Sequence, residues 1–213
     1  MSDIVEDLLL QHKLISDQVS VAEVRAVLLS LKTVLDSKVA GDICEFGCYS
    51  GTTSLFISRL LSLSGSKKRL FVYDSFEGLP PKTKEDSSPA GIEFITGELK
   101  FSKKSFIENY RKASLKLPII KKGWFSNLTE DDLPEKIALL FLDGDYYESV
   151  LDPLNLSARK LSPGSIIIVD DYLNPKLPGA SKAADYWLKL NNLQEGRDYT
   201  RQTVSDMLIL KLK

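Results

Sequence analysis

From residue 40 onward, short apolar runs alternate with longer amphipathic stretches, and this alternation limits the fold more than any other feature of the sequence. The apolar runs cover residues 41–46, 69–74, 119–120, 136–143 and 165–171. The amphipathic stretches cover residues 52–63, 103–115, 147–160 and 180–191. Strands that alternate with helices in this way form βαβ units, and these units build a parallel sheet with helices on both faces. Two closing runs, at 199–204 and 207–212, predict an antiparallel edge. We therefore expect an α/β fold with a doubly wound, mostly parallel sheet of seven strands.

The residues before this pattern predict a helical preface. We expect helices at 3–19 and 21–36, because Ser20 and Glu23 form a capping box and apolar residues then recur at helical spacing. With 213 residues and 43% hydrophobic composition, the chain is long enough for one sizeable core and too short for two ordinary domains. We expect a single domain over 1–213, with a preface or lid at 1–38 and the sheet-forming core at 39–213.

The stretch from 76 to 101 is too rich in proline and glycine to form one regular helix. We expect it to be a mobile flap. Together with the preface helices, it is the segment that we expect to form the wall around a substrate.

Charge and cysteine content narrow the classes of partner. Lys and Arg total 28 against 29 Asp and Glu, so no positive excess favours nucleic acid or an anionic membrane. The acidic N-terminus and the lack of a long apolar run indicate a cytoplasmic protein without a membrane partner. Cys44 and Cys48 are at the wrong spacing for a redox or zinc pair, and His12 is the only histidine, so a site with several histidines is excluded within one chain.

Acidic residues follow the predicted strands at the edge where open α/β sheets bind ligands: Glu45, Asp74, Asp143, Asp170 and Asp171. Folding alone does not explain them, because unpaired carboxylates that lie close together repel one another. If the fourth and fifth strands are neighbours, their ends lie ~5 Å apart, and the last three acids surround one volume that suits Mg²⁺. Alternatively, one of the adjacent pair points to solvent or caps a turn. Asp145 lies in a turn and is left out of the predicted site.

The first of these turns contains two glycines that are four residues apart, Gly47 and Gly51. The dinucleotide fingerprint has a different spacing, which argues against NAD. A glycine turn that opens a helix can also bind a carboxylate at the helix N-terminus. Asp74, at the end of the next strand, stands where an acid would bind ribose hydroxyls. Each of these features also has an ordinary structural explanation, either a tight turn or a strand-ending aspartate.

Five segments make the chain resemble a known family. They are 45–51 (EFGCYSG), 73–80 (YDSFEGLP), 122–125 (KGWF), 142–149 (LDGDYYES) and 169–172 (VDDY). Together, over about residues 40–190 and in the same order, they resemble the macrocin O-methyltransferase (TylF-type) family. Its members are class I enzymes with a Rossmann-like fold that depend on S-adenosylmethionine and are assisted by a metal.

The resemblance implies a role for individual residues. It implies a methionine moiety near Glu45, Gly47 and Gly51, with Thr52 beside them, and a ribose at Asp74 next to Ser75 and Phe76. Trp124 and Phe125 would border the adenine, although a tryptophan after an apolar strand is more often part of a core. Asp143 would lie against the cofactor and act as general base, and the metal ligands would be Asp143, Asp170 and Asp171.

The resemblance therefore implies an O-methyltransferase that transfers a methyl group from S-adenosylmethionine to a hydroxyl of a small molecule, with Mg²⁺ or another hard divalent cation. The acceptor would be a sugar or phenolic group of a natural product. Two alternatives stay open. Asp143-Gly144-Asp145 also matches the DxD motif of metal-dependent glycosyltransferases, and the same fold can serve as a binding module without catalysis. A homo-oligomer is compatible with each of these interpretations.

Overall fold

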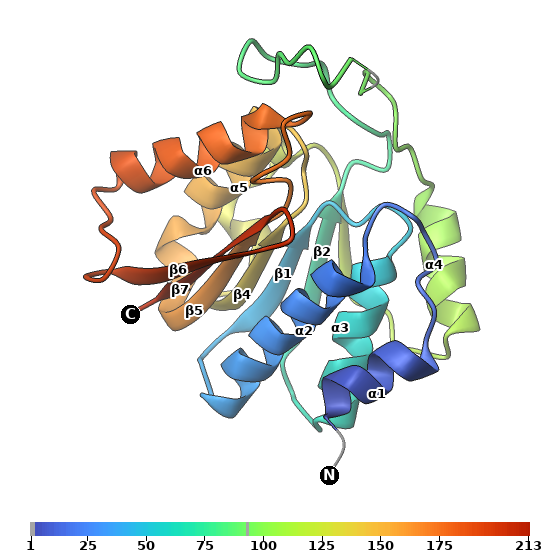
Figure 1. The fold of residues 1–213 in the computed structure, drawn as a ribbon. Helices are drawn as coiled ribbons and strands as arrows, with labels where there is room; N and C mark the ends of the chain where they lie inside the picture. The colour runs from blue at the N-terminus through green and yellow to red at the C-terminus, as the bar shows by residue number, and fades with distance from the viewer. Residues whose placement is uncertain (1–2, 93) are drawn as a thin grey trace.

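The computed structural model describes residues 3–92 and 94–213, which fold around one seven-stranded sheet of order β3-β2-β1-β4-β5-β7-β6 (Figure 1). The strands are β1 (Asp42–Phe46), β2 (Leu70–Asp74), β3 (Ile119–Lys122), β4 (Ile137–Leu142), β5 (Leu161–Val169), β6 (Tyr199–Val204) and β7 (Met207–Leu212). The first five pair in parallel, and β7 runs antiparallel to both β5 and β6. The predicted fold class, including its antiparallel edge, is confirmed.

Helices cover both faces of the sheet. They are α1 (Ile4–Gln11), α2 (Val21–Asp36), α3 (Thr52–Leu63), α4 (Lys103–Lys112), α5 (Tyr147–Ser157) and α6 (Pro178–Leu190). Helices α1 to α3 lie on one face, and α5 and α6 lie on the other (Figure 1). Among the described residues, no helix combines the length and apolar character that crossing a bilayer requires.

The apolar character of β4 at every position follows from this sandwich. Leu139 and Phe141 pack into the core on the α2–α3 side, and Leu140 and Leu142 pack into the core on the α5–α6 side. Successive side chains of a strand point to opposite faces, so a strand that is covered on both faces has no polar position. All six residues of β4 are buried.

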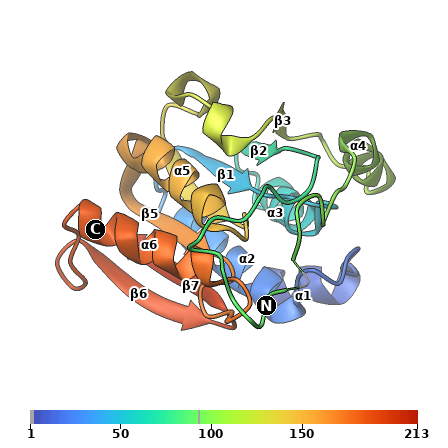
Figure 2. The same cartoon turned by 90° about the horizontal axis from the view of Figure 1, so that it is seen from above.

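The strand order reverses between β1 and β4. From β1 the chain crosses through α3 to β2, and from β4 it crosses through α5 to β5 on the other side. The loops that follow β1 and β4 therefore diverge and leave a crevice beyond the carboxyl ends of the strands. The segment between β2 and α4, which contains the predicted flap, runs over this edge of the sheet (Figures 1 and 2).

The largest differences from the predicted boundaries lie at the first helix and at β5. The first helix was expected to reach residue 19, but it ends at Gln11, because His12 has an extended backbone. The segment that follows reaches α3, where the hydroxyls of Ser16 and Thr52 lie 3.0 Å apart. The predicted turn at 163–164 lies inside β5, which begins at Leu161 and pairs there with Ile137. The predicted capping box of α2, made by Ser20 and Glu23, is confirmed.

Candidate functional site

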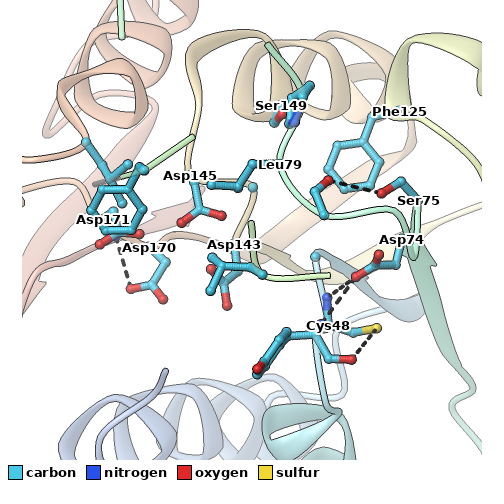
Figure 3. A pocket seen from close by; sticks show the side chains of 18 of the residues that line it. Cys48, Asp74, Ser75, Leu79, Phe125, Asp143, Asp145, Ser149, Asp170 and Asp171 are labelled. Atoms are coloured by element: carbon cyan, nitrogen blue, oxygen red, sulfur yellow. Dashed lines mark hydrogen bonds between the residues drawn. The ribbon is translucent and has the colours of Figure 1, made fainter. Parts of the chain in front are cut away.

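A cavity of about 520 Å³ opens beyond the carboxyl ends of β1, β2, β4 and β5. Figure 3 shows its labelled residues in a row, with Asp74, Ser75 and Phe125 at one end, Asp143 in the middle and Asp170 and Asp171 at the other end. This order follows from the sheet, in which β2, β1, β4 and β5 are consecutive neighbours. The cavity therefore contacts the ends of four neighbouring strands.

The glycine turn after β1 lets the ends of β1 and β4 approach each other. Gly47 has a φ of 84°, and a Cβ atom at this position would lie 1.8 Å from the carbonyl oxygen of Asp143. Only glycine is compatible with both constraints. The amide of Asp143 donates to the carbonyl of Phe46 (2.8 Å), so the backbone that carries Asp143 lies directly beside the turn.

Asp74 joins two loops with its carboxylate. Its Oδ2 accepts the backbone N–H groups of Cys48 (2.9 Å) and Tyr49 (3.2 Å), and its Oδ1 accepts that of Phe76 (2.6 Å). The side chain also lines the cavity. Charge-assisted bonds to three backbone groups hold this carboxylate in one position at the edge of the cavity.

The other predicted cofactor residues divide into two groups. Gly47, Ser75, Trp124, Phe125 and Asp143 line the cavity together with Asp74. Trp124 is 38% exposed, so it belongs to the rim and not to the core. The residues that lie behind the lining are Glu45, Gly51, Thr52 and Phe76.

Glu45 is the most deeply buried of these. It is 1% exposed and accepts a hydrogen bond from the hydroxyl of Ser54 on α3. Burial raises the pKa of Glu45 to about 8, even though the bond from Ser54 opposes this shift. Its carboxyl group therefore ties β1 to α3 behind the glycine turn. Phe76 packs against Phe106 with its ring centroid 6.0 Å away.

Three carboxylates meet in the middle of the cavity. Asp143, Asp145 and Asp171 each offer an oxygen, and these oxygens lie within 4.8 Å of one another. Burial raises the pKa of Asp143 well above its ordinary value, and the charge of Asp170 raises it further. Burial also raises the pKa of Asp145 and that of Asp171. Such a cluster favours either bound protons or a bound cation.

This cluster differs from the predicted one at one position. Asp145, which was left out of the predicted site, belongs to it. Asp170 lines the cavity, but its Oδ1 accepts the amide of Asp171 (3.0 Å), and it is not among the three clustered acids. The backbone explains the difference, because Asp145 and Asp171 both adopt left-handed conformations, with φ of 62° and 55°. Periodicity along the sequence carries no signal for such residues, although aspartate is one of the side chains that tolerate them.

The cavity also contains residues that the sequence analysis did not single out for the site. Asp17, Gln18 and Glu23 come from the preface, and Glu148, Ser149 and Asp152 come from α5. Asn174 donates to Oδ1 of Asp171 (2.7 Å) and so orients one of the clustered acids. Of these residues, only Glu23 stood out in the sequence, and there as part of a capping box. The flap contributes Leu79, Pro80, Pro81, Phe94 and Leu99, so the preface and the flap both form walls of the cavity, as expected.

Comparison with known proteins gives related sequences. A family model described as macrocin O-methyltransferase (TylF) matches residues 18–198. The 8-demethyl-8-(2,3-dimethoxy-alpha-L-rhamnosyl)-tetracenomycin-C 4'-O-methyltransferase of Streptomyces olivaceus is 33% identical over 149 residues, which are 67% of this chain and 57% of that protein. The mycinamicin III 3''-O-methyltransferase of Micromonospora griseorubida is 29% identical over 154 residues, 68% of this chain and 60% of that protein. The chain thus spans less than two thirds of the length of these curated relatives.

Solved structures share the fold. The O-methyltransferase NovP superimposes with a TM-score of 0.79 at 24% identity and covers 92% of this chain and 81% of its own. CalS11, a calicheamicin methyltransferase, gives a TM-score of 0.68 at 20% identity and covers 97% of this chain and 90% of its own. At these identities the likeness concerns the fold, a Rossmann-like methyltransferase architecture. Because the family model matches most of its length, the chain belongs to the macrocin O-methyltransferase (TylF) family.

Proposed function

We propose that this protein transfers the methyl group of S-adenosylmethionine to a hydroxyl of a small molecule, a sugar or phenolic group of a natural product. The observation that carries the proposal is one cavity with a fixed carboxylate, Asp74, at one end and a carboxylate cluster, Asp143, Asp145 and Asp171, beside it. Relatives named for methyl transfer to mycinamicin III, to a rhamnosyl-tetracenomycin and to demethyldecarbamoylnovobiocin support the class of acceptor.

The cofactor is proposed to lie along the carboxyl ends of β3, β2 and β1. Asp74 accepts hydrogen bonds from the ribose hydroxyls, with Ser75 beside it, and Trp124 and Phe125 border the adenine. The methionine moiety lies over Gly47, where the absence of a side chain leaves room for it. Glu45 and Thr52 support the turn from behind, since neither lines the cavity. This arrangement directs the sulfonium toward Asp143.

The three clustered carboxylates are proposed to hold a divalent cation. Their oxygens lie close enough to share one ion, their mutual repulsion would be relieved by it, and a set of oxygen ligands suits Mg²⁺. A bound cation of this kind lowers the pKa of an alcohol or phenol and orients it. Asn174 keeps Asp171 turned toward the cluster through its bond to Oδ1. Asp170 contributes negative charge beside this set.

Asp143 is proposed as the general base that accepts the proton of the acceptor hydroxyl. Its carboxylate stands between the glycine turn and the cluster, on the line from cofactor to acceptor. Burial and the neighbouring carboxylates raise its pKa only while no cation is bound, so the proposed role as base rests on the position of the carboxylate. Asp145 is buried in the same cluster, and a comparison of Asp143→Asn with Asp145→Asn separates the roles of the two residues.

The charge of the cavity narrows the class of acceptor. Among the described residues that line it, every side chain with a charge is acidic: Asp17, Glu23, Asp74, Asp143, Asp145, Glu148, Asp152, Asp170 and Asp171. S-adenosylmethionine carries a positive sulfonium, and such a field favours it. A phosphate on the acceptor would find no cationic side chain to receive it, and only the proposed cation would offset the repulsion from these carboxylates. We therefore propose that the acceptor is an uncharged or cationic small molecule and not a nucleic acid. We also propose that the protein acts in the cytoplasm.

Transfer of a labelled methyl group from S-adenosylmethionine to a panel of hydroxylated glycosides and phenols tests the proposal. The panel includes a matched pair, one sugar with and without a phosphate group. We expect label in at least one neutral or amine-bearing acceptor and less in the phosphorylated partner. Cofactor binding without label in any acceptor would favour a binding module. Absence of cofactor binding would contradict the proposal as a whole.

A further inference from the structure

Asp86 is a buried acid in the flap that does not line the cavity. Asp86 is 2% exposed, and both of its carboxylate oxygens accept hydrogen bonds. Oδ2 accepts the backbone N–H (2.8 Å) and the hydroxyl (2.7 Å) of Thr83, and Oδ1 accepts the backbone N–H of Tyr147 (2.7 Å). The first two bonds are local to the flap. The third connects the flap to the first residue of α5.

Helix α5 lacks an N-cap from its own sequence. Tyr146 stands at the N-cap position and makes no side-chain capping bond. The first amides of a helix have no partner within the helix, and an acidic side chain there is also favoured by the helix dipole. Asp86, which lies 61 residues earlier in the chain, supplies the missing acceptor. The start of α5 is therefore completed by a residue of the flap.

Helix α6 closes the same junction from a third side. Gly179, in its first turn, approaches so closely that a Cβ atom there would lie 1.9 Å from Oδ1 of Asp86 and 2.6 Å from the amide nitrogen of Tyr147. The carboxylate is thus enclosed by the flap, α5 and α6. Any side chain at residue 179 would displace it.

The same two segments meet a second time through Tyr146. Its ring is buried with Leu79 of the flap and Leu177 in a small apolar cluster that also includes Phe94 and Leu99. Its hydroxyl donates to the carbonyl of Phe94 (3.2 Å). Because Leu79, Phe94 and Leu99 line the cavity, this cluster joins the acceptor wall to the loop between β4 and α5.

That loop contains Asp143 and Asp145, two of the three clustered acids, directly before Tyr146 and Tyr147. We infer that Asp86 is a positioning residue that holds the flap and the acid loop in one fixed relation, so that the acceptor is presented to the acids in a single orientation. The expected effect of Asp86 on turnover rests on the proposed function. The coupling of the flap to the acid loop is independent of that function.

The test compares Asp86→Ala and Asp86→Asn with Ser88→Ala. Ser88 also tethers the flap, through its bond to the carbonyl of Pro175 (2.7 Å), but it neither contacts α5 nor lines the cavity. Asp86→Ala should lower kcat/KM for the acceptor at least tenfold, with the loss in both kcat and KM, while the affinity for S-adenosylmethionine changes less than twofold. Asp86→Asn keeps one acceptor oxygen and should recover part of the loss. Gly179→Ala should reproduce the effect of Asp86→Ala, and Ser88→Ala should not.

Hydrogen exchange provides a readout that does not need turnover. In Asp86→Ala, amides of both the flap (77–92) and the acid loop (143–150) should exchange at least several-fold faster, whereas Ser88→Ala should affect the flap alone. If no acceptor is methylated by the unaltered protein but both segments respond to Asp86→Ala, the proposed function fails and the coupling stands. A response confined to the flap, or an unchanged kcat/KM in a folded Asp86→Ala protein, overturns the inference. An equal loss of cofactor and acceptor binding would mean a general structural role, and it would overturn the inference as well.

Discussion

The carboxylate of Asp74 stabilises the turn after β1 and faces the proposed ribose site at the same time. Asp74→Ala should weaken binding of S-adenosylmethionine tenfold to a hundredfold, because loss of a charge-assisted pair of hydrogen bonds costs about 2–3 kcal/mol. Isothermal titration calorimetry measures this directly. Glu77→Gln is the matched control, since Glu77 lies in the same turn, pairs with Lys100 and Lys122 and does not line the cavity. Equal affinity in the Asp74 variant would remove this residue from the site.

Glu45 makes the stability of the protein depend on pH in a defined direction. Burial raises its pKa from 4.5 to about 8, so the folded protein holds a proton that the unfolded chain releases. The stabilising contribution of this proton is fully present below pH 4.5 and is lost as the pH rises to about 8. The unfolding free energy of the unaltered protein, minus that of Glu45→Gln, should therefore fall between pH 5 and pH 8 in urea titrations.

Glu77→Gln is again the control for this measurement. Lys100 and Lys122 lower the pKa of Glu77 to about 2, so its contribution is complete above pH 4.5 and should not change between pH 5 and pH 8. If the Glu45 difference were also flat over this range, the assignment of a protonated, buried Glu45 would be wrong.

At the residue scale, the sequence predicts which acids reach the cavity better than how they are arranged there. Asp74, Asp143, Asp170 and Asp171 follow strands whose ends are set by their apolar runs, and all four line the cavity. The clustering of Asp145 could not be predicted, because it depends on a left-handed backbone at that residue. The burial of Glu45 could not be predicted either, because its partner Ser54 lies on the next helix.

At the scale of elements, the turn that carries Asp170 and Asp171 is anchored by the residue after it. The hydroxyl of Tyr172 donates to Asp185 on α6 (2.8 Å) and accepts a hydrogen bond from Arg201 on β6 (2.5 Å). The guanidinium of Arg201 also lies 4.9 Å from the centre of the Tyr172 ring. One hydroxyl thus connects the turn to two elements.

Tyr172→Phe removes both hydrogen bonds and leaves the ring in place. The free energy of unfolding should fall by about 1–2 kcal/mol, because two partly buried hydrogen bonds are lost. Tyr186→Phe is the control, since Tyr186 lies next to Asp185 on α6 and is 48% exposed. Urea unfolding checks the difference, and equal stability of the two variants would exclude an anchoring role for the hydroxyl.

The element boundaries that the sequence analysis missed have physical causes. Helical spacing continues weakly past Gln11, but the chain turns away there because the segment that contains Ser16 packs against α3. Pro163 and Gly164 favour a turn, yet they lie within β5 because the strand continues across an irregularity in its pairing with β4.

The flap was recognised from its prolines and glycines. Its attachment through Asp86 depends on contacts 61 residues away, which a local pattern does not encode. Its mobility without ligand, and its ordering when cofactor and acceptor are bound, stay predictions.

At the scale of the whole molecule, the alternation of strands and helices predicts a doubly wound, mostly parallel sheet, whereas the order of its strands is known only from the structure. In that order, the proposed cofactor residues lie at or just after the ends of β1 to β3, and the clustered acids follow β4 and β5. The two functions of the cavity should therefore be separable by mutation.

Variants of the acids test this separation. Asp171→Asn and Asp145→Asn should raise the Mg²⁺ concentration needed for methyl transfer, and Asp170→Asn should have a smaller effect, because its oxygens are not among the clustered ones. Asp143→Asn should lower turnover by ~10²–10⁴-fold even when Mg²⁺ is saturating, as is typical of lost general base catalysis. Calorimetry should find the affinity for S-adenosylmethionine nearly unchanged in the Asp145, Asp170 and Asp171 variants and moderately lower in Asp143→Asn, whose carboxylate is proposed to lie next to the sulfonium.

Chelation is the control for the cation itself. A chelator should abolish methyl transfer, and added Mg²⁺ should restore it. If the chelated protein still methylates its acceptor at the full rate, the cation has no part in the reaction. The clustered aspartates would then serve the structure or the proton transfer alone.

The most direct test of the central claim is a crystal structure of the protein with S-adenosylhomocysteine and Mg²⁺. We expect the adenine beside Trp124 and Phe125, the ribose hydroxyls on Asp74, the sulfur next to Asp143, and the ion among Asp143, Asp145 and Asp171. S-adenosylhomocysteine bound in the reverse direction, or outside this cavity, would contradict the account.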